Sequence, residues 1–143
     1  MNKELIINAA PQGVEIALLE DKKLVELHHE KADASFAVGD LYLGKVKKLI
    51  PGLNAAFVDV GFEKDAFLHY TDLSPYARSL LKFTQQSINT NPDSSFDFST
   101  FQVEPEIIKT GKINEVLSGK PNVLVQILKE PIAAKGPRLS CEL

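Results

Sequence analysis

Residues 52–73 read GLNAAFVDVGFEKDAFLHYTDL and contain two short strand patterns joined by the turn FEKD. Side chains alternate between the two faces of a strand, so Val58 lies on one face of the first strand and Phe57 on the other. In the second strand, Phe67 and His69 share a face. A short turn pairs neighbouring strands antiparallel. We therefore expect Phe57, Phe67 and His69 to lie together on one side of a sheet whose other side is the core.

Further strand patterns flank this stretch. LYLGKVKKLI precedes it, and NVLVQILKEPI and RLSCEL follow it. A helical pattern, PYARSLLKFTQQSI, and a turn-rich segment, NTNPDSSFDFST, separate the third strand from the fourth. Five short strands with a helix and a long loop between them are typical of an OB-fold barrel. We predict a mainly β protein with this barrel over residues 37–143 and an insertion at about 74–114.

The first 36 residues are predicted to form a separate unit. ELIIN, VEIALLE and LVELHH are strand-like, and the charged link from Glu20 to Lys23 indicates a β-hairpin. Such a hairpin buries little surface by itself, so we expect it to need a partner surface. The segment EKADASFAVGD that follows has little apolar periodicity and is predicted to be a linker.

Composition indicates a soluble globular protein, because 44% of the 143 residues are hydrophobic and 24% are charged. No apolar run is long enough to cross a bilayer, and the start of the chain lacks the pattern of a secretory signal, so we expect a cytoplasmic location. The single cysteine, Cys141, lies in an alternating strand pattern and is interpreted as a small buried hydrophobe. The chain stops inside that pattern, which suggests a piece of a longer protein.

Basic residues are placed where they could border the predicted aromatic face. Lys45, Lys47 and Lys48 lie in the first barrel strand, with Lys45 and Lys47 on one face, while Lys129, Lys135 and Arg138 flank the last turn. Aromatic rings that stack bases, with cations for the phosphates, are a device for binding single-stranded nucleic acid. A phenylalanine in a strand is also commonly a core residue and a strand lysine a solvated one. The residues alone leave both readings open.

The segment 83–108 has no lysine or arginine but contains four acidic residues, Asp93, Asp97, Glu104 and Glu106. Such a segment would repel a polyanion, so we do not expect it to bind nucleic acid.

Motifs for catalysis are missing from the sequence, which has no phosphate-binding glycine loop, zinc spacing or HExxH. His28 and His29 are interpreted as surface residues. A second reading assigns a metal site to a group of carboxylates around a turn, Asp59, Glu63, Asp65 and Asp72. Carboxylates are common in turns, so the first expectation is a binding module with no catalytic residue and no metal of its own.

The order of VGDLYLGKVKKLIPGLNAAFVDVGFEKDAFLH, LVQILKE and KGPRLS resembles the RNA-binding domain named after ribosomal protein S-one. The opening ELIINAAPQGVEIALLEDKKLVELHHEK narrows the resemblance to bacterial endoribonucleases of the RNase E/G family. The resemblance covers nearly the whole chain except the insertion.

This resemblance implies that the opening strands belong to an RNase H-like subdomain and that the barrel binds single-stranded RNA. By resemblance, Phe57, Phe67 and Lys135 match RNA-binding positions, and His69 matches a histidine used in related S-one domains. Lys129 is a further candidate, and Arg138 is added because strand alternation places it on the wet face.

The family's chemistry is Mg²⁺-dependent phosphodiester hydrolysis by an oligomer whose subunits are linked through zinc-binding cysteines. Both metal sites are expected outside these residues, so this chain by itself is expected to be inert. Three alternatives stay open: a free-standing S-one domain, an OB-type protein interaction module, and a small enzyme that uses the carboxylates near Phe57.

Overall fold

The computed structural model describes residues 1–31, 35–94 and 96–143, so Ala32, Asp33 and Ala34 of the predicted linker lie outside the described residues. The chain divides into two compact units, Met1–Ser35 and Phe36–Leu143.

The N-terminal unit is an antiparallel sheet of three strands in the order β1 (Lys3–Ala10), β2 (Gly13–Glu20) and β3 (Lys23–Lys31). The predicted hairpin is the β2–β3 pair, and β1 adds a third strand to it. Asp21 and Lys22 form the two-residue link between β2 and β3, and both have positive φ. Positive φ at both central residues suits the turns whose twist matches that of paired strands.

Both faces of this sheet carry apolar side chains. Leu5 and Ile7 share one face and are 63% and 60% exposed, while Ile6 and Leu27 share the other and are 51% and 64% exposed. A sheet with one wet face would show apolar residues on the other face alone. The side chains of β1, β2 and β3 therefore leave apolar surface uncovered on both faces.

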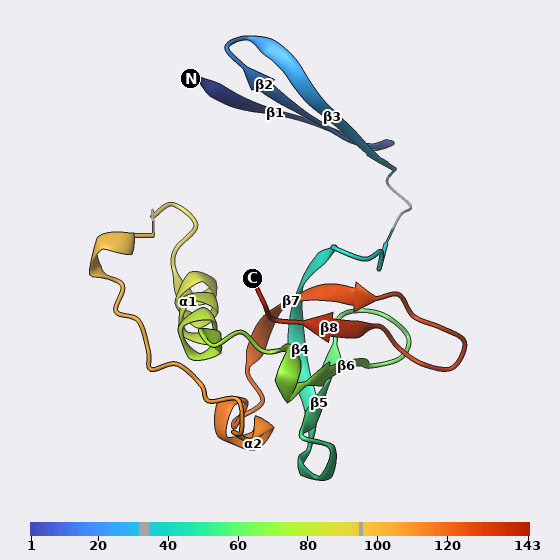
Figure 1. Ribbon diagram of the computed structural model, residues 1–143, viewed down its shortest axis with the longest axis vertical. Coiled ribbons are helices and arrows are strands. Elements are labelled where there is room, and N and C mark those ends of the chain that lie inside the picture. The colour runs from blue at the N-terminus through green and yellow to red at the C-terminus, as the bar shows by residue number, and fades with distance from the viewer. Residues whose placement is uncertain (32–34, 95) are drawn as a thin grey trace. The chain divides into compact units, whose positions relative to one another are not determined.

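The second unit is a closed five-stranded barrel, which confirms the predicted mainly β, OB-type architecture (Figure 1). Its strands are β4 (Leu41–Ile50), β5 (Ala55–Asp59), β6 (Ala66–His69), β7 (Asn122–Lys129) and β8 (Arg138–Ser140). They pair in the order β4-β5-β6-β8-β7. All pairs are antiparallel except β6–β8, which is parallel, and β7–β4 closes the barrel.

The interior of the barrel follows the alternation seen in the sequence. Val46, Val58, Leu68, Val125 and Leu139 come from five different strands, and each is at most 1% exposed. The valine face of β5 is thus the core face, as predicted. Burial of these side chains is the main favourable term that holds the barrel together.

Short helical turns follow two of the strands. Pro51–Leu53 (η1) connects β4 to β5, and Tyr70–Asp72 (η2) follows β6. The strand pattern predicted through Leu73 is therefore shorter in the structure, because the chain turns directly after His69.

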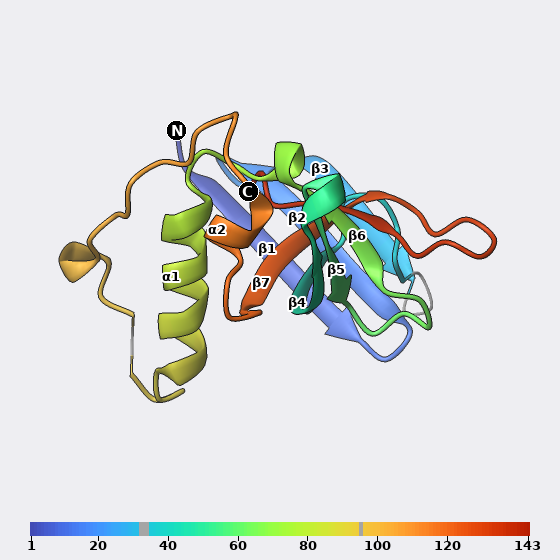
Figure 2. The same cartoon turned by 90° about the horizontal axis from the view of Figure 1, so that it is seen from below.

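The insertion lies between β6 and β7 and begins with the predicted helix, α1 (Ala77–Asn89). A 3-10 turn (η3, Phe98–Thr100) and the short helix α2 (Ile113–Val116) follow. In both views of the molecule, α1 lies on one side of the barrel and the β7–β8 loop extends from the opposite side (Figures 1 and 2). The turn-rich segment also packs more than its composition suggested, because Phe96 stacks edge-on against Phe83 of α1 at 5.0 Å between ring centres.

Among the residues that the structure describes, no helix is long and apolar enough to cross a membrane.

Candidate nucleic-acid interface

Phe57 of β5 and Phe67 of β6 lie directly opposite each other on the outer face of the barrel. Their ring centres are 6.0 Å apart, with 67° between the ring planes, and both side chains are half-buried. His69 lies two residues along β6, 6.3 Å from the Phe67 ring. The structure therefore brings together the three residues of the predicted aromatic face. We call them the aromatic platform.

The imidazole of His69 is held in one orientation by the turn that follows it. Its Nδ1 accepts a hydrogen bond from the backbone N–H of Thr71 at 3.1 Å and lies 2.8 Å from the Thr71 hydroxyl. Because Nδ1 is an acceptor here, the neutral ring carries its proton on Nε2. Nε2 is thus the donor that the ring can offer to a bound molecule.

β4 carries three lysines beside the platform, and a β-bulge in this strand sets which of them lies opposite a ring. The register shifts between Val46 and Lys48, so that Lys48 pairs with Phe57. Simple alternation places Lys45 and Lys47 on one face and Lys48 on the other. The bulge inserts one extra residue into β4 and makes Lys48 the cross-strand neighbour of Phe57, a position that alternation along the sequence does not predict.

Lys45 is also exposed, and it pairs with Asp59. The Asp59 carboxylate accepts a hydrogen bond from the backbone N–H of Gly61 at 2.9 Å. An acidic residue therefore lies beside Lys45, whereas Lys48 lies opposite a platform ring, Phe57.

On the other side of the platform, Arg138 of β8 pairs with Phe67, and Lys129 of β7 pairs with Arg138. The outer face therefore carries one continuous cross-strand row: Lys48, Phe57, Phe67, Arg138, Lys129. Two rings lie at its centre, with cations on both sides.

The guanidinium of Arg138 is occupied by a partner within the chain. Its Nε and Nη2 both donate to Oδ2 of Asp72, at 3.2 and 3.0 Å. Asp72 was not among the expected site residues, except as a possible metal ligand. The ion pair fixes the arginine beside Phe67 and cancels part of its charge, so Arg138 offers less to a phosphate than an unpaired arginine would.

Lys135 lies in the β7–β8 loop, which is fastened to the β5–β6 turn. The carbonyl of Pro137 accepts from the N–H of Phe67 at 2.8 Å, and Pro137 is fully buried. At Gly136 a Cβ would lie 2.2 Å from the carbonyl oxygen of Asp65, so only glycine allows this approach. Lys135 itself is exposed at the edge of this contact. The backbone thus ties its loop to the strand that carries Phe67.

The carboxylates considered as a metal site have separate roles. Asp72 binds Arg138, Asp59 caps the turn at Gly61, and Glu63 and Asp65 are exposed. Within the described part of the chain, no three metal-ligating side chains form a group. His28 and His29 are exposed and lie beside different glutamates, Glu26 and Glu15.

Cys141 is buried, as interpreted from its place in the sequence. Burial raises the pKa of its thiol to about 12, and the neighbouring Asp72 charge adds to the shift. A thiol of this kind stays protonated at neutral pH and is a poor nucleophile. The groups that the interface offers to a ligand are therefore its rings, the imidazole of His69 and its cations, and the Cys141 thiol is not one of them.

Comparison with known proteins matches the chain to ribonucleases G and ribonucleases E. It is 32% identical over 140 residues to ribonuclease G of Haemophilus influenzae, an alignment that covers 98% of this chain and 24% of that protein. Ribonuclease G of Escherichia coli is 29% identical over 143 residues, covering 100% of this chain and 25% of that protein. Ribonuclease E of Nostoc sp. is 34% identical over 146 aligned positions, covering 98% of this chain and 16% of that protein.

No protein-family profile matches the chain. It spans about a quarter of the length of the ribonucleases G it matches. Because the matches to ribonucleases G and E extend over nearly all of its residues, this chain belongs to the RNase E/G family.

Proposed function

We propose that the barrel binds single-stranded RNA across the row Lys48, Phe57, Phe67, Arg138 and Lys129, with His69 and Lys135 at its margins. The single observation that carries the proposal is the position of Phe57 and Phe67, two half-exposed rings on adjacent strands between cations. Ordinary core packing does not account for rings on the outer face.

The chemistry of the row suits an unpaired strand. A base can stack on each ring, and base–aromatic stacking contributes about 1–3 kcal/mol per base. Lysine ammonium groups on either side would lie near the phosphates that flank stacked bases. The Nε2–H of His69 would donate to a base edge or a 2′-hydroxyl, the group that distinguishes RNA from DNA.

In the whole protein, this binding would serve an endoribonuclease that cleaves single-stranded RNA during RNA processing and decay. Support comes from the kinship with ribonucleases G and E. We propose that Mg²⁺ for hydrolysis and Zn²⁺ for oligomer assembly are bound outside these 143 residues. The β1–β2–β3 sheet would then be part of an RNase H-like subdomain, in a cytoplasmic enzyme of bacterial type.

Binding of a 5′-monophosphorylated RNA decamer, measured by fluorescence anisotropy, tests the platform. We expect Phe57→Ala and Phe67→Ala each to weaken binding by about tenfold, the loss of one stacked base. Phe98→Ala is the matched control, because Phe98 is an exposed phenylalanine of the insertion. Wild-type protein that does not bind RNA, or platform variants that bind like the control, would sink the proposal.

The lysines are tested through the salt dependence of the same binding. Lys48→Ala and Lys135→Ala should each reduce the slope of log K against log salt by about 0.7, the value for one phosphate contact on a single strand. Lys109→Ala removes an exposed lysine of the insertion and serves as control. Equal slopes for all three variants would assign the attraction to overall charge instead.

Incubation of the chain with RNA and Mg²⁺ tests the proposal that these residues bind RNA and that another part of the whole protein cleaves it. We expect binding without cleavage, because the described residues form no metal-ligating group. Appearance of cleaved RNA that depends on Mg²⁺ and disappears in Asp59→Asn would instead support the small-enzyme alternative.

A further inference from the structure

Arg138 uses only one edge of its guanidinium for the ion pair with Asp72. The two hydrogen bonds to Oδ2 come from Nε and Nη2, which lie on the same edge of the guanidinium plane. Both N–H groups of Nη1 and the second N–H of Nη2 take no part in this pair. One N–H of each nitrogen points forward from the end of the side chain, and we call these two parallel donors the end fork.

Asp72 is fixed to the strand that carries Arg138. Its backbone carbonyl accepts from the N–H of Cys141 at 2.9 Å, and the next residue, Leu73, forms a parallel bridge with Cys141. The Asp72 side chain is 16% exposed, whereas that of Arg138 is 40% exposed and within reach of a ligand. Asp72 thus restrains the guanidinium from a mostly covered position, which lowers the entropy cost of any further hydrogen bond that the end fork makes.

The turn that contains Asp72 also orients His69. Thr71 and Asp72 are consecutive residues of η2, and Thr71 binds Nδ1 of His69 through its backbone N–H and lies 2.8 Å from it with its hydroxyl. One short turn therefore holds two donor side chains that neighbour Phe67, one along β6 and one across on β8. Donors held in fixed directions suit the recognition of a base edge, which depends on the direction of hydrogen bonds.

The charge of the pair points away from a phosphate as the partner of Arg138. A phosphate is attracted by net positive charge, which the lysines of the row supply and which Asp72 cancels in part at Arg138. The edge of a base is neutral, so the loss of net charge costs little there, and the direction of the two donors is kept.

Phe67 brings a base into the reach of this arginine. Arg138 and Phe67 are directly paired across β8 and β6, and directly paired residues on one face of a sheet lie close enough for long side chains to interact. A base that stacks on the Phe67 ring would therefore present its edge to the neighbouring arginine.

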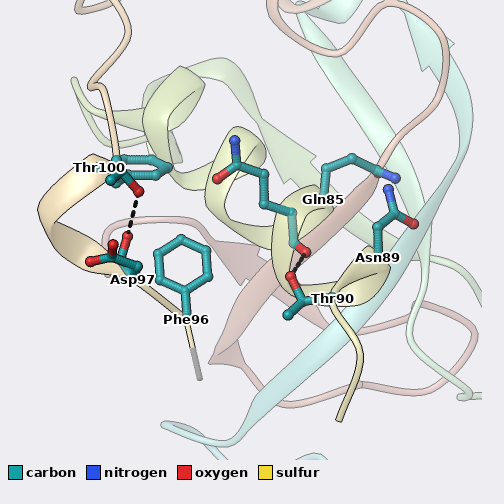
Figure 3. A pocket seen from close by; sticks show the side chains of 8 residues that line it. Gln85, Asn89, Thr90, Phe96, Asp97 and Thr100 are labelled. Carbon is teal, nitrogen blue, oxygen red and sulfur yellow. Dashed lines mark hydrogen bonds between the residues drawn. The ribbon is translucent and has the colours of Figure 1, made fainter. Parts of the chain in front are cut away.

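The pocket of the insertion is a poorer site for a base. It has a volume of about 410 Å³ and lies beside the C-terminal half of α1 (Figure 3). The amides of Gln85 and Asn89 point away from Phe96 and Asp97 there. The described residues that line it include no lysine or arginine. The outer face of the barrel, where donors are held beside a ring, is the better place for base recognition.

We infer that Arg138, held in place by Asp72, selects guanine in the RNA that the barrel binds, an inference that rests on the proposed function. Guanine presents two neighbouring acceptors, O6 and N7, which match the two parallel donors of the end fork. Adenine has a donor next to N7, and uracil has an N–H between its two carbonyls, so neither base accepts both bonds. Cytosine has neighbouring acceptors but covers less of a ring than a purine does. Asp72 is a positioning residue, because it contacts Arg138 and not the base.

Fluorescence anisotropy with four RNA decamers tests the selection. One decamer is all uridine, and the other three carry a single guanosine, adenosine or cytidine at a central position. We expect the guanosine decamer to bind at least about fivefold more tightly than the adenosine and uridine decamers. Equal binding of all four, or tightest binding of the cytidine decamer, would overturn the inference and leave RNA binding intact. Failure to bind any decamer would overturn the proposed function itself.

Replacement of the guanosine by 7-deazaguanosine, which keeps O6 and lacks N7, tests the end fork directly. The wild type should bind this decamer about threefold less tightly, because one of two hydrogen bonds is lost. Arg138→Lys keeps the charge without the rigid fork, so it should bind both decamers within about twofold of each other. Arg78→Lys changes an arginine of α1 and is the matched control. A wild type that binds both decamers equally, or a control that behaves like Arg138→Lys, would contradict the assignment.

Asp72→Asn separates positioning from a purely structural role. Because the charge of Arg138 is then no longer cancelled, the all-uridine decamer should bind more tightly, and the slope of log K against log salt should steepen by up to about 0.7. The preference for guanosine should fall at the same time. Asp93→Asn removes the same charge from the insertion and is the control. Equal changes of slope in the two variants would show an effect of net charge alone and overturn the role of Asp72.

Arg138→Ala is the second variant if circular dichroism shows that Asp72→Asn does not fold. It should abolish the preference for guanosine while its salt slope stays within about 0.2 of the wild type. A slope reduced by about 0.7 with the preference kept would assign Arg138 to a phosphate and overturn the inference.

Discussion

Gly136 lies where two loops approach so closely that a side chain does not fit. A Cβ at this position would lie 2.2 Å from the Asp65 carbonyl oxygen, a backbone atom that cannot swing away. We expect Gly136→Ala to lower the free energy of unfolding by about 1–3 kcal/mol, the usual cost of forced overpacking. Urea denaturation followed by circular dichroism measures this change.

Gly52→Ala is the control for this substitution, because a Cβ at Gly52 meets no atom within 4 Å. Its unfolding free energy should stay within about 0.5 kcal/mol of the wild type. If both alanine variants are equally stable, the β7–β8 loop is not fastened at Gly136, and the position of Lys135 beside β6 is wrong.

Cys141 makes the stability of the barrel depend on pH at alkaline values. Burial raises its pKa from 9.0 to about 12 in the folded chain. The folded state therefore keeps the proton that the unfolded state loses first, so stability is fully present below pH 9 and falls between about pH 9 and 12. Each pH unit in this window removes about 1.4 kcal/mol.

Urea unfolding of the wild type and of Cys141→Ala, each at pH 8 and at pH 10, checks this prediction. The alanine variant lacks the thiol, while lysine and tyrosine titration is common to both chains. We expect the wild type to lose about 1.4 kcal/mol more than the variant over this interval. Parallel losses in the two proteins would mean that the thiol is accessible in the folded state.

At the scale of secondary-structure elements, Asn54 joins the β4–β5 turn to the end of the insertion. Its amide donates to the carbonyl of Gly111 at 3.1 Å and its Oδ1 accepts from the N–H of Ile113 at 2.7 Å. Its backbone is left-handed, with φ of 50°, a conformation that asparagine tolerates better than most residues.

Replacement of Asn54 should therefore loosen the start of α2 and strain the turn. Asn54→Ala should cost about 3 kcal/mol of unfolding free energy, from the lost hydrogen bonds and the strained backbone. Asn54→Gly keeps the left-handed backbone without strain and should cost about 1 kcal/mol less. Urea unfolding measures both losses of unfolding free energy. Equal losses in the two variants would mean that the hydrogen bonds account for the whole loss and that backbone strain contributes nothing.

The strands and the insertion differ in how well the sequence predicted them. Alternation of Val58 with Phe57 predicted which face of β5 is core, because the pleat dictates it. The pairing of Lys48 with Phe57 depends on a β-bulge, and no residue pattern in β4 predicts that bulge. Arg138 reaches Phe67 through a parallel pairing of strands about 70 residues apart, and Asp72, in the 3-10 turn after β6, accepts from Arg138 across 66 residues of sequence. Such contacts are set by tertiary structure and are invisible to local periodicity.

At the scale of the whole molecule, the two units differ in how much of their apolar surface they bury. The barrel has a fully buried core, whereas Leu5, Ile7 and Leu27 of the N-terminal sheet are at least 60% exposed. We expect amide hydrogen exchange in β1 to β3 to be faster than in β4, β5 and β7, because protection follows burial and local stability. Mass spectrometry of exchanged peptides measures this, and equal protection of the two units would show that the sheet is covered in solution.

The position of β8 has a consequence for the order of events during protein synthesis. A ribosome completes β4, β5, β6 and β7 first, and β8 then inserts between β6 and β7. Until Arg138–Ser140 has emerged, both of those strands present unpaired edges. Before β8 is added, the four other strands therefore form an open sheet instead of a closed barrel. The outer row of rings and cations becomes continuous only when β8 pairs with β6 and β7.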